Sequence, residues 1–220
     1  MTFDVGYAMC ALPALLRGAA VTIEVAVLAV LLGLVVGVAL TVLRASGIRV
    51  LGSLAALHIS LARGTPLFIQ ILVVYYALPA IGLDVPRFTA GVVALSLNGG
   101  AYIAEMIRGG LSAIPRGQID AARAVGMKSS LVWRHIRFPQ VFVLILPPLT
   151  VEFAALLKAS SLLSVIAVVE LTRTAQGIIS NSFRPVEIWI TAGILYFVMC
   201  YALTAVTRRF ERLAALWRPV

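Results

Sequence analysis

Long apolar runs are the feature that most constrains the fold of this chain. About 20 mostly apolar residues are needed to cross the hydrocarbon core of a bilayer, which is roughly 30 Å thick. Five stretches reach or approach this length, and they are 19–42, 66–83, 88–107, 141–171 and 188–206. Backbone polar groups inside a bilayer must be satisfied within the chain, so each stretch is expected to be helical. The sequence predicts an all-α, polytopic membrane protein with five transmembrane helices.

Composition agrees with a membrane protein and narrows the function. Hydrophobic residues make up 61% of the 220 positions, against about 45–50% in soluble domains. The net charge is +9. In a membrane protein, basic residues in cytoplasmic loops account for such a charge, so it does not indicate nucleic-acid binding. Cys10 and Cys200 lie far apart without metal-ligand spacing. We therefore expect no nucleic-acid partner and no metal site.

The distribution of Lys and Arg predicts the orientation. With five spans and the N-terminus outside, thirteen of the eighteen basic residues fall on the inner side and four on the outer side, while Lys158 lies within the fourth stretch. Dividing 141–171 into two spans would instead place the C-terminal arginines outside. We therefore predict an external N-terminus, a cytoplasmic C-terminus and a partly embedded or external segment at 160–182.

One charged, helix-forming stretch, 105–140, interrupts the apolar sequence. Pro115 favours a helix start, and Gly126 favours a helix end because glycine readily adopts the left-handed conformation of a C-cap. Ser129 or Ser130 is expected to cap a second, amphipathic helix, which Pro139 is expected to end. The pattern predicts a helix, a glycine turn and a second helix on the cytoplasmic face.

Two interpretations of this helix-turn-helix stay open on composition alone. An amphipathic helix can lie in a groove of a partner protein and transmit a rigid movement. It can also rest on the anionic inner leaflet, attracted by basic residues such as Arg134 and Arg137.

The stretch resembles the EAA loop in permease subunits of bacterial ABC importers. That pattern is Glu-Ala-Ala, three residues, Gly, nine residues, Ile, one residue and Leu-Pro. In this chain it corresponds to Asp120-Ala121-Ala122, Gly126, Ile136 and Phe138-Pro139. Asp for Glu and Phe for Leu are the two departures.

Other segments resemble the branch of this family that imports polar amino acids. They include Arg63-Gly64-Thr65-Pro66, Ser96-Leu97-Asn98, Ala101-Tyr102-Ile103-Ala104-Glu105, Leu146-Pro147-Pro148 and Glu152-Phe153. Val151 and Ala159 depart from the Asn and Asp usual in that branch. The resemblance implies a single permease domain over 1–220, a cytoplasmic coupling loop at 110–139, and transport of an amino acid or a similar small polar solute across the bacterial inner membrane. The coupling residues that it implies are Asp120, Ala121, Ala122, Gly126, Trp133, Ile136 and Pro139.

Partners follow from what the sequence lacks. It contains no Gly-Lys dipeptide and therefore no P-loop, and it shows no catalytic motif, so we expect no enzyme activity and no cofactor on this chain. The resemblance implies that ATP and Mg²⁺ bind to separate cytoplasmic ATPase subunits. It also implies a second permease subunit, identical or related, an extracytoplasmic substrate-binding protein and contact with membrane lipid.

Polar residues inside the apolar stretches are candidates for the substrate path, because a charge at the bilayer centre costs at least about 2.5–3.5 kcal/mol on insertion scales. Glu152 is our preferred ligand for a substrate ammonium group, with a hydrogen bond between helices as the alternative. For Glu105, an ion pair with Arg108 one turn away and a substrate contact are equally consistent with the sequence. The full candidate set is Asn98, Tyr102, Glu105, Glu152, Lys158 and Ser160.

Two further expectations complete the sequence analysis. Gly33 and Gly37 are four residues apart and would allow close contact with a neighbouring helix. An ion-coupled secondary transporter or channel subunit is the alternative class of function, although the chain shows none of the internal repeats common in such transporters.

Overall fold

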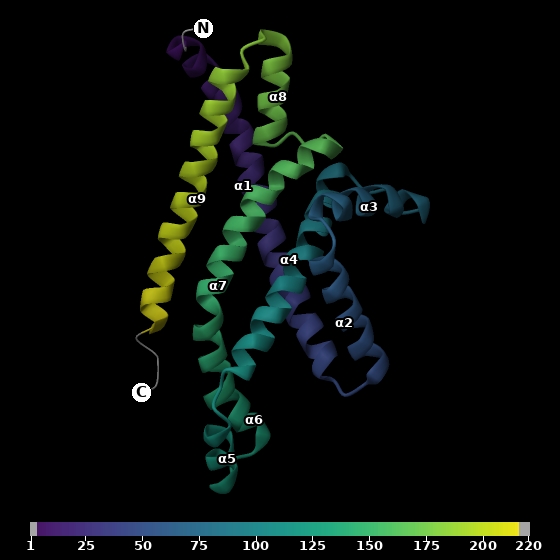
Figure 1. Ribbon diagram of the computed structural model, residues 1–220, viewed down its shortest axis with the longest axis vertical. Helices are drawn as coiled ribbons and strands as arrows, with labels where there is room; N and C mark the ends of the chain where they lie inside the picture. The colour runs from purple at the N-terminus through teal and green to yellow at the C-terminus, as the bar shows by residue number, and fades with distance from the viewer. Residues whose placement is uncertain (1–3, 216–220) are drawn as a thin grey trace.

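The computed structural model describes residues 4–215, and within that range every regular element is a helix. Figure 1 shows an elongated bundle with the N-terminus and α8 at one end and α5 and α6 at the other. The elements are α1 (Val5–Ala45), α2 (Arg49–Gly64), α3 (Leu67–Ala80), α4 (Arg87–Ser112), α5 (Arg116–Ala124), α6 (Ser129–Val132), the π-helix η1 (Trp133–Arg137), α7 (Phe138–Ala159), the 3₁₀-helix η2 (Ser160–Ile166), α8 (Leu171–Ser182) and α9 (Pro185–Ala215).

Within the described residues, four helical stretches are long and apolar enough to cross a membrane: α1, α4, the continuous run 129–166 and α9. A fifth is obtained only if α2 and α3 are taken together across a 120° bend. The predicted span at 66–83 is therefore corrected, because the helix found there, α3, is too short to cross a membrane without α2. α3 alone has 14 residues and a length of about 21 Å. Pro66, the N-cap of α3, disfavours helical geometry at the residue before it, and so separates the two helices.

α1 extends well beyond the predicted 19–42. It begins at Val5 because Asp4 caps it, with the carboxylate Oδ1 accepting the Tyr7 N–H at 3.0 Å. Its 41 residues correspond to about 62 Å, roughly twice the thickness of the hydrocarbon core.

The segment from α6 to the start of α7 corrects two expectations. Lys128 is the N-cap of α6, and neither Ser129 nor Ser130 provides a side-chain cap. Pro139 does not end a helix, because it lies in the first turn of α7, where the missing N–H of proline costs little. The π-helix η1, with its wider turn, directly precedes α7.

The proline pair at 147–148 does not break α7 either. Neighbouring helices and small local adjustments can satisfy the backbone groups that proline frees inside a membrane. The change of direction comes later, where η2 ends at Ala167 with a φ of +58°.

The longest interface in the bundle joins α1 and α4, and small residues permit it. A Cβ at Gly37 would lie 2.6 Å from Ile103 Cγ2, and a Cβ at Gly100 would lie 2.5 Å from Val36 Cγ1. The backbones approach so closely that neither position accommodates a side chain without movement. The expectation of close helix contact at Gly33 and Gly37 is thus confirmed, and α4 is the partner.

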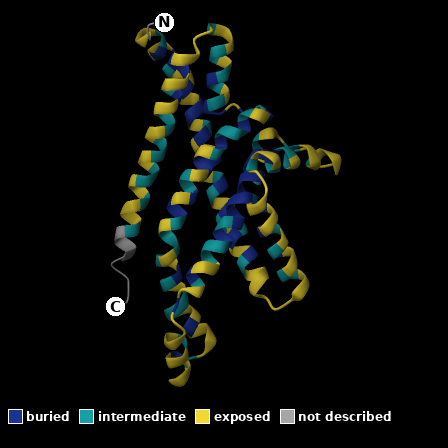
Figure 2. Ribbon diagram, viewed as in Figure 1, coloured by how far each residue is buried: buried dark blue, intermediate teal, exposed yellow. Residues whose placement is uncertain are grey.

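Three apolar clusters of described residues hold the bundle together. The largest joins α1, α3, α4, α7 and η2 around Val25, Ile71, Leu95 and Leu163. A second packs the first half of α1 against α8 and α9, and a third packs α2 against α1 and α4. Figure 2 shows the buried residues concentrated along α1 and α4, whereas α9, α3 and the α5–α6 end are largely exposed.

Candidate coupling loop and substrate path

The helix-turn-helix is built as the sequence predicts at its glycine. α5 ends in a Schellman arrangement, in which the Met127 N–H donates to the Ala122 carbonyl at 3.0 Å and the Gly126 N–H donates to the Arg123 carbonyl at 2.9 Å. Gly126 has a φ of +80°, a left-handed conformation that suits glycine. The prediction that the first helix stops at Gly126 is confirmed.

A small core and one polar contact hold the loop against the bundle. Ala122 is 6% exposed and Val132 is 4% exposed, so the two helices of the turn bury these side chains. The Gln140 side-chain amide at the start of α7 donates to Gln118 Oε1 in α5 at 2.7 Å. The loop is therefore attached to α7 at both of its helices.

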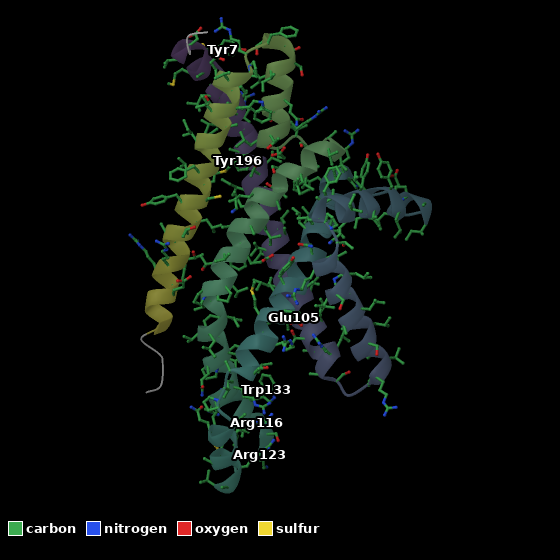
Figure 3. The ribbon with its side chains drawn as sticks, viewed as in Figure 1. Tyr7, Glu105, Arg116, Arg123, Trp133 and Tyr196 are labelled. Atoms are coloured by element: carbon green, nitrogen blue, oxygen red, sulfur yellow. The ribbon has the colours of Figure 1, made fainter. Side chains whose placement is uncertain are left out.

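The outer surface of the loop is free and basic. Asp120, Ala121, Gly126 and Pro139 are exposed, whereas Ile136 is half-buried. Trp133 is 45% exposed. The Arg137 guanidinium lies 5.5 Å from the centre of the Trp133 ring, which is within the range of a cation–π contact. Figure 3 shows Trp133, Arg116 and Arg123 at this projecting end, below Glu105.

A hydrogen-bond clamp fixes the bend between α2 and α3 onto α4. The Asn98 amide donates to the Ala62 carbonyl and to Gln70 Oε1, both at 3.0 Å. The Gln70 amide in turn donates to the carbonyls of Ala62 and Thr65. Asn98, predicted to face a cavity, is only 6% exposed and connects helices. Gln70 was missed, although it is the one polar side chain in the α3 apolar run before the tyrosines, and intramembrane polar groups often join helices.

Glu105 lies among three arginines from three helices. Arg44 of α1 donates to Oε1 at 2.6 Å, and Arg108 of α4 donates to Oε2 through Nε and Nη2 at 2.9 and 2.8 Å. Arg63 of α2 is 3.6 Å from Oε2. Arg63 also lies over the half-buried Tyr102 ring, 5.7 Å from its centre. The ion pair between Glu105 and Arg108, one of the two alternatives left open by the sequence, is present, together with two further cations that sequence spacing does not reveal.

The second group of candidates lies on α7 and η2. Glu152 is 9% exposed, and none of the described side chains forms an ion pair or hydrogen bond with it. Lys158 is exposed, six residues further along the helix, and does not pair with Glu152. Ser160 is fully buried and donates to the Leu157 carbonyl at 2.7 Å. Glu152 is thus a mostly buried residue whose carboxylate keeps some accessible surface and has no partner among the described side chains.

Two polar clusters near the N-terminal end were not predicted. Glu170, fully buried, caps α8 by accepting the N–H groups of Thr172 and Arg173, and it accepts the Tyr196 hydroxyl at 2.9 Å. Burial raises the pKa of the Glu170 carboxyl above its ordinary value, against the effect of these hydrogen bonds. The sequence signal was available, because an acidic residue directly before Leu171-Thr172-Arg173 is typical of a helix start.

The other cluster joins the beginnings of α1 and α9. Arg184 donates to Asp4 Oδ2 at 2.5 Å, and its guanidinium lies 4.8 Å from the centre of the Tyr7 ring. The hydrogen bond from Arg184 holds the pKa of the Asp4 carboxyl below its usual value. These residues are 180 positions apart, and no short-range pattern predicts their contact.

Comparison with known proteins assigns the family. Residues 30–215 match a family model described as the binding-protein-dependent transport system inner membrane component. The match covers most of the chain, and the chain therefore belongs to this family. It is a multi-pass inner-membrane permease subunit of an ABC importer, a class that works with ATPase and binding-protein partners and leaves ATP hydrolysis to a separate subunit.

Several curated relatives align over nearly their whole length. The arginine transport system permease protein ArtQ of Bacillus subtilis (strain 168) is 34% identical and covers 96% of this chain and 97% of its own. The glutamine transport system permease protein GlnP of Escherichia coli (strain K12) is 36% identical over 96% and 98%. The nopaline transport system permease protein NocM of Agrobacterium fabrum is 38% identical over 93% and 88%.

Solved structures agree with this assignment. The crystal structure of an amino acid ABC transporter with histidines contains a chain that is 38% identical, with a TM-score of 0.90 and coverage of 96% of this chain and 99% of that one. A chain of the inward-facing MetNI methionine ABC transporter, 21% identical with a TM-score of 0.74, shares the fold. These matches do not favour an ion-coupled secondary transporter or channel.

Proposed function

We propose that this permease subunit carries an amino acid, and that Glu152 binds its ammonium group. Support for the substrate class comes from the relatives named for arginine and glutamine transport. Support for Glu152 comes from its burial without a cation among the described residues. A buried carboxylate is expected to have a partner, and an ammonium group that arrives with the substrate would supply one.

The observation that carries the proposal is the continuity between the loop and this carboxylate. A single helical run, 129–166, contains the second helix of the loop and also Glu152. Ile136 and Glu152 are sixteen residues apart, about 24 Å along a helix. A movement imposed on the loop would therefore reach the substrate path through one continuous helical run.

We propose that segment 110–139 is the coupling loop, at which a cytoplasmic ATPase subunit docks and supplies ATP and Mg²⁺ chemistry. Its exposed surface and its attachment to α7 suit an element that fits a partner groove. The residues we assign to this role are Asp120, Ala121, Ala122, Gly126, Trp133, Ile136 and Pro139.

The remaining path candidates divide by their contacts. Tyr102 and Lys158 retain exposed surface, and we place them along the path with Glu152. Asn98, Glu105 and Ser160 are engaged within the chain, so we propose that they shape its walls.

The assembly follows from the size of the chain and its charge distribution. We propose that the 220 residues form one permease domain with an external N-terminus and a cytoplasmic C-terminus, as the basic residues indicate. Two permease subunits, identical or related, would enclose the path between them, and an extracytoplasmic binding protein would deliver the substrate.

The substitution Glu152→Gln tests the substrate proposal. It keeps the shape of the side chain and removes the charge that would hold an ammonium group. A hydrogen bond to a charged group contributes about 1.5–3 kcal/mol, so the apparent affinity for a labelled amino acid should fall about 10- to 100-fold. Uptake is measured in membrane vesicles that contain the complete importer, over a range of substrate concentrations.

The control is Glu24→Gln, which removes an exposed carboxylate from an equally apolar helix. This variant should transport as the wild type does. If Glu152→Gln leaves both uptake and substrate-stimulated ATP hydrolysis at wild-type values, Glu152 does not bind the substrate.

A further inference from the structure

The cluster around Glu105 has more positive charge than its one carboxylate neutralises. Arg44, Arg63 and Arg108 all approach Glu105 within 4 Å, which leaves two excess positive charges. The side chains of the three arginines are 42%, 46% and 54% exposed, whereas that of Glu105 is 17% exposed. The excess charge is therefore presented at the surface of the bundle.

Individual atoms show where a further anion would bind. Arg44 uses Nη1, and Arg108 uses Nε and Nη2, to bind Glu105. Arg44 Nη2 and Arg108 Nη1 donate to no atom of the described residues. Guanidinium groups are well suited to phosphate oxygens, because their planar donors match the geometry of the anion.

An apolar cleft is lined in part by Arg44 and Arg108. It has a volume of about 210 Å³ and runs between α1, α2 and α4. Its floor includes the buried side chains of Ile59 and Ala104, which are 4% and 3% exposed. The lining residues are Thr41, Arg44, Ala45, Ile59, Ala104, Arg108 and Leu111.

We propose that this cleft binds an anionic phospholipid. Arg44 and Arg108 would hold the headgroup phosphate, and the first part of an acyl chain would lie against Ala45 and Leu111, the apolar lining residues that keep accessible surface. The apolar lining explains why the ligand is a lipid, because a free phosphate gains nothing from it. Basic pockets between membrane helices on the cytoplasmic side are suited to anionic headgroups.

The depth of the cleft in the membrane rests on the proposed function. Glu105 lies seven residues before the end of α4 at Ser112, about 10 Å along the helix, and the coupling loop follows directly. Figure 3 shows Glu105 on the side of the bundle that faces the loop. If that loop is cytoplasmic, the arginines lie at the inner leaflet, where anionic lipids are concentrated.

The test measures lipid retention by native mass spectrometry. The full chain is taken from nanodiscs that contain equal amounts of phosphatidylglycerol and phosphatidylcholine. We expect wild-type protein to retain phosphatidylglycerol preferentially. The double substitution Arg44→Gln and Arg108→Gln should lower this preference by roughly 30-fold.

A second variant separates a cleft site from simple surface attraction. Ala45 is exposed and lines the cleft, so Ala45→Phe fills the cleft without changing any charge or ion pair. Ala45→Phe should also reduce retention of phosphatidylglycerol. The matched charge control is Arg184→Gln, in the segment between α8 and α9, and it should retain lipid as the wild type does.

Three outcomes would overturn the proposal. They are equal retention of the two lipids by the wild type, unchanged retention in Ala45→Phe, and an equal loss in Arg184→Gln. The measurement uses neither substrate nor ATPase. Glu152→Gln should retain phosphatidylglycerol normally, so failure of the lipid proposal and failure of the transport proposal are distinguishable.

Discussion

The ion pair between Asp4 and Arg184 makes the stability of the chain depend on pH. Because Arg184 lowers the pKa of Asp4 in the folded chain, the pair stabilises the fold above the unfolded Asp pKa of about 3.9. This contribution is lost as the pH falls through the lower, folded pKa. The Asp4–Arg184 ion pair joins the start of α1 to the segment before α9.

The difference in melting temperature between wild type and Arg184→Gln in detergent tests this account. The difference should be constant between pH 8 and pH 5 and should shrink below about pH 4, as Asp4 becomes protonated. Asp4→Asn has no carboxyl group at this position, so the difference in melting temperature between Asp4→Asn and Arg184→Gln should not shrink in this way. A difference that persists or grows at pH 3 would contradict the assignment.

At the residue scale, the sequence identified important polar side chains but not all of the residues that they contact. The positive φ of Gly126 follows from helix-end chemistry, which acts over a few residues and can be read locally. The partners of Asn98 and Glu105 could not be predicted in full. Gln70 and Arg44 come from α3 and α1, and only tertiary packing brings those helices to α4.

Among the elements, the crossing of α1 and α4 depends on the absence of side chains. A Cβ at Gly37 would meet Ile103 Cβ at 2.8 Å and the Gly100 carbonyl at 3.0 Å. The substitution Gly37→Val should therefore lower stability by about 1–3 kcal/mol, the usual cost of overpacking.

Thermal unfolding in detergent, followed by tryptophan fluorescence, measures this effect. Gly193→Ala in α9 is the control, because a Cβ there has no neighbour within 4 Å and alanine favours a helix. Gly193→Ala should melt at or slightly above the wild-type temperature. A Gly37→Val protein with wild-type stability would show that the helices do not approach as closely as described.

Element types were predictable and element boundaries were less so. Hydrophobic length identified α1, α4 and α9, because the demands of a bilayer leave helix as the only option. The same length argument failed at 66–83, where Pro66 and the Asn98–Gln70 contact hold a 120° bend. The prediction that Pro139 ends a helix also failed, because proline is tolerated in the first turn of a helix.

For the whole molecule, the run from α6 to η2 connects the proposed coupling loop to the proposed substrate path. It contains α6, the second helix of the proposed coupling loop, and also the buried residue Glu152. Two hydrogen bonds attach this run to neighbouring helices: Gln140 donates to Gln118 of α5, and Thr150 donates to Glu211 of α9. Such a continuous element can connect ATP hydrolysis on a partner to a change at the substrate path.

The central claim is that a cytoplasmic ATPase subunit docks on the proposed coupling loop, whose shape depends on the left-handed turn at Gly126. Valine at Gly126 would be forced into a left-handed conformation that costs about 1–2 kcal/mol for ordinary residues and more for a β-branched one. We expect the loop to refold locally and lose its fit to the ATPase, while the bundle stays intact because Gly126 is exposed and has no neighbour within 4 Å.

The most direct measurement is substrate-stimulated ATP hydrolysis by the purified importer in proteoliposomes, with copurification of the ATPase subunit as the second readout. Gly117→Ala is the control, because Gly117 lies in the same loop with open space around it and no positive φ. We predict that Gly126→Val lowers stimulated hydrolysis at least about tenfold and loses the ATPase subunit, whereas Gly117→Ala keeps both. Wild-type hydrolysis and copurification in Gly126→Val would contradict the account.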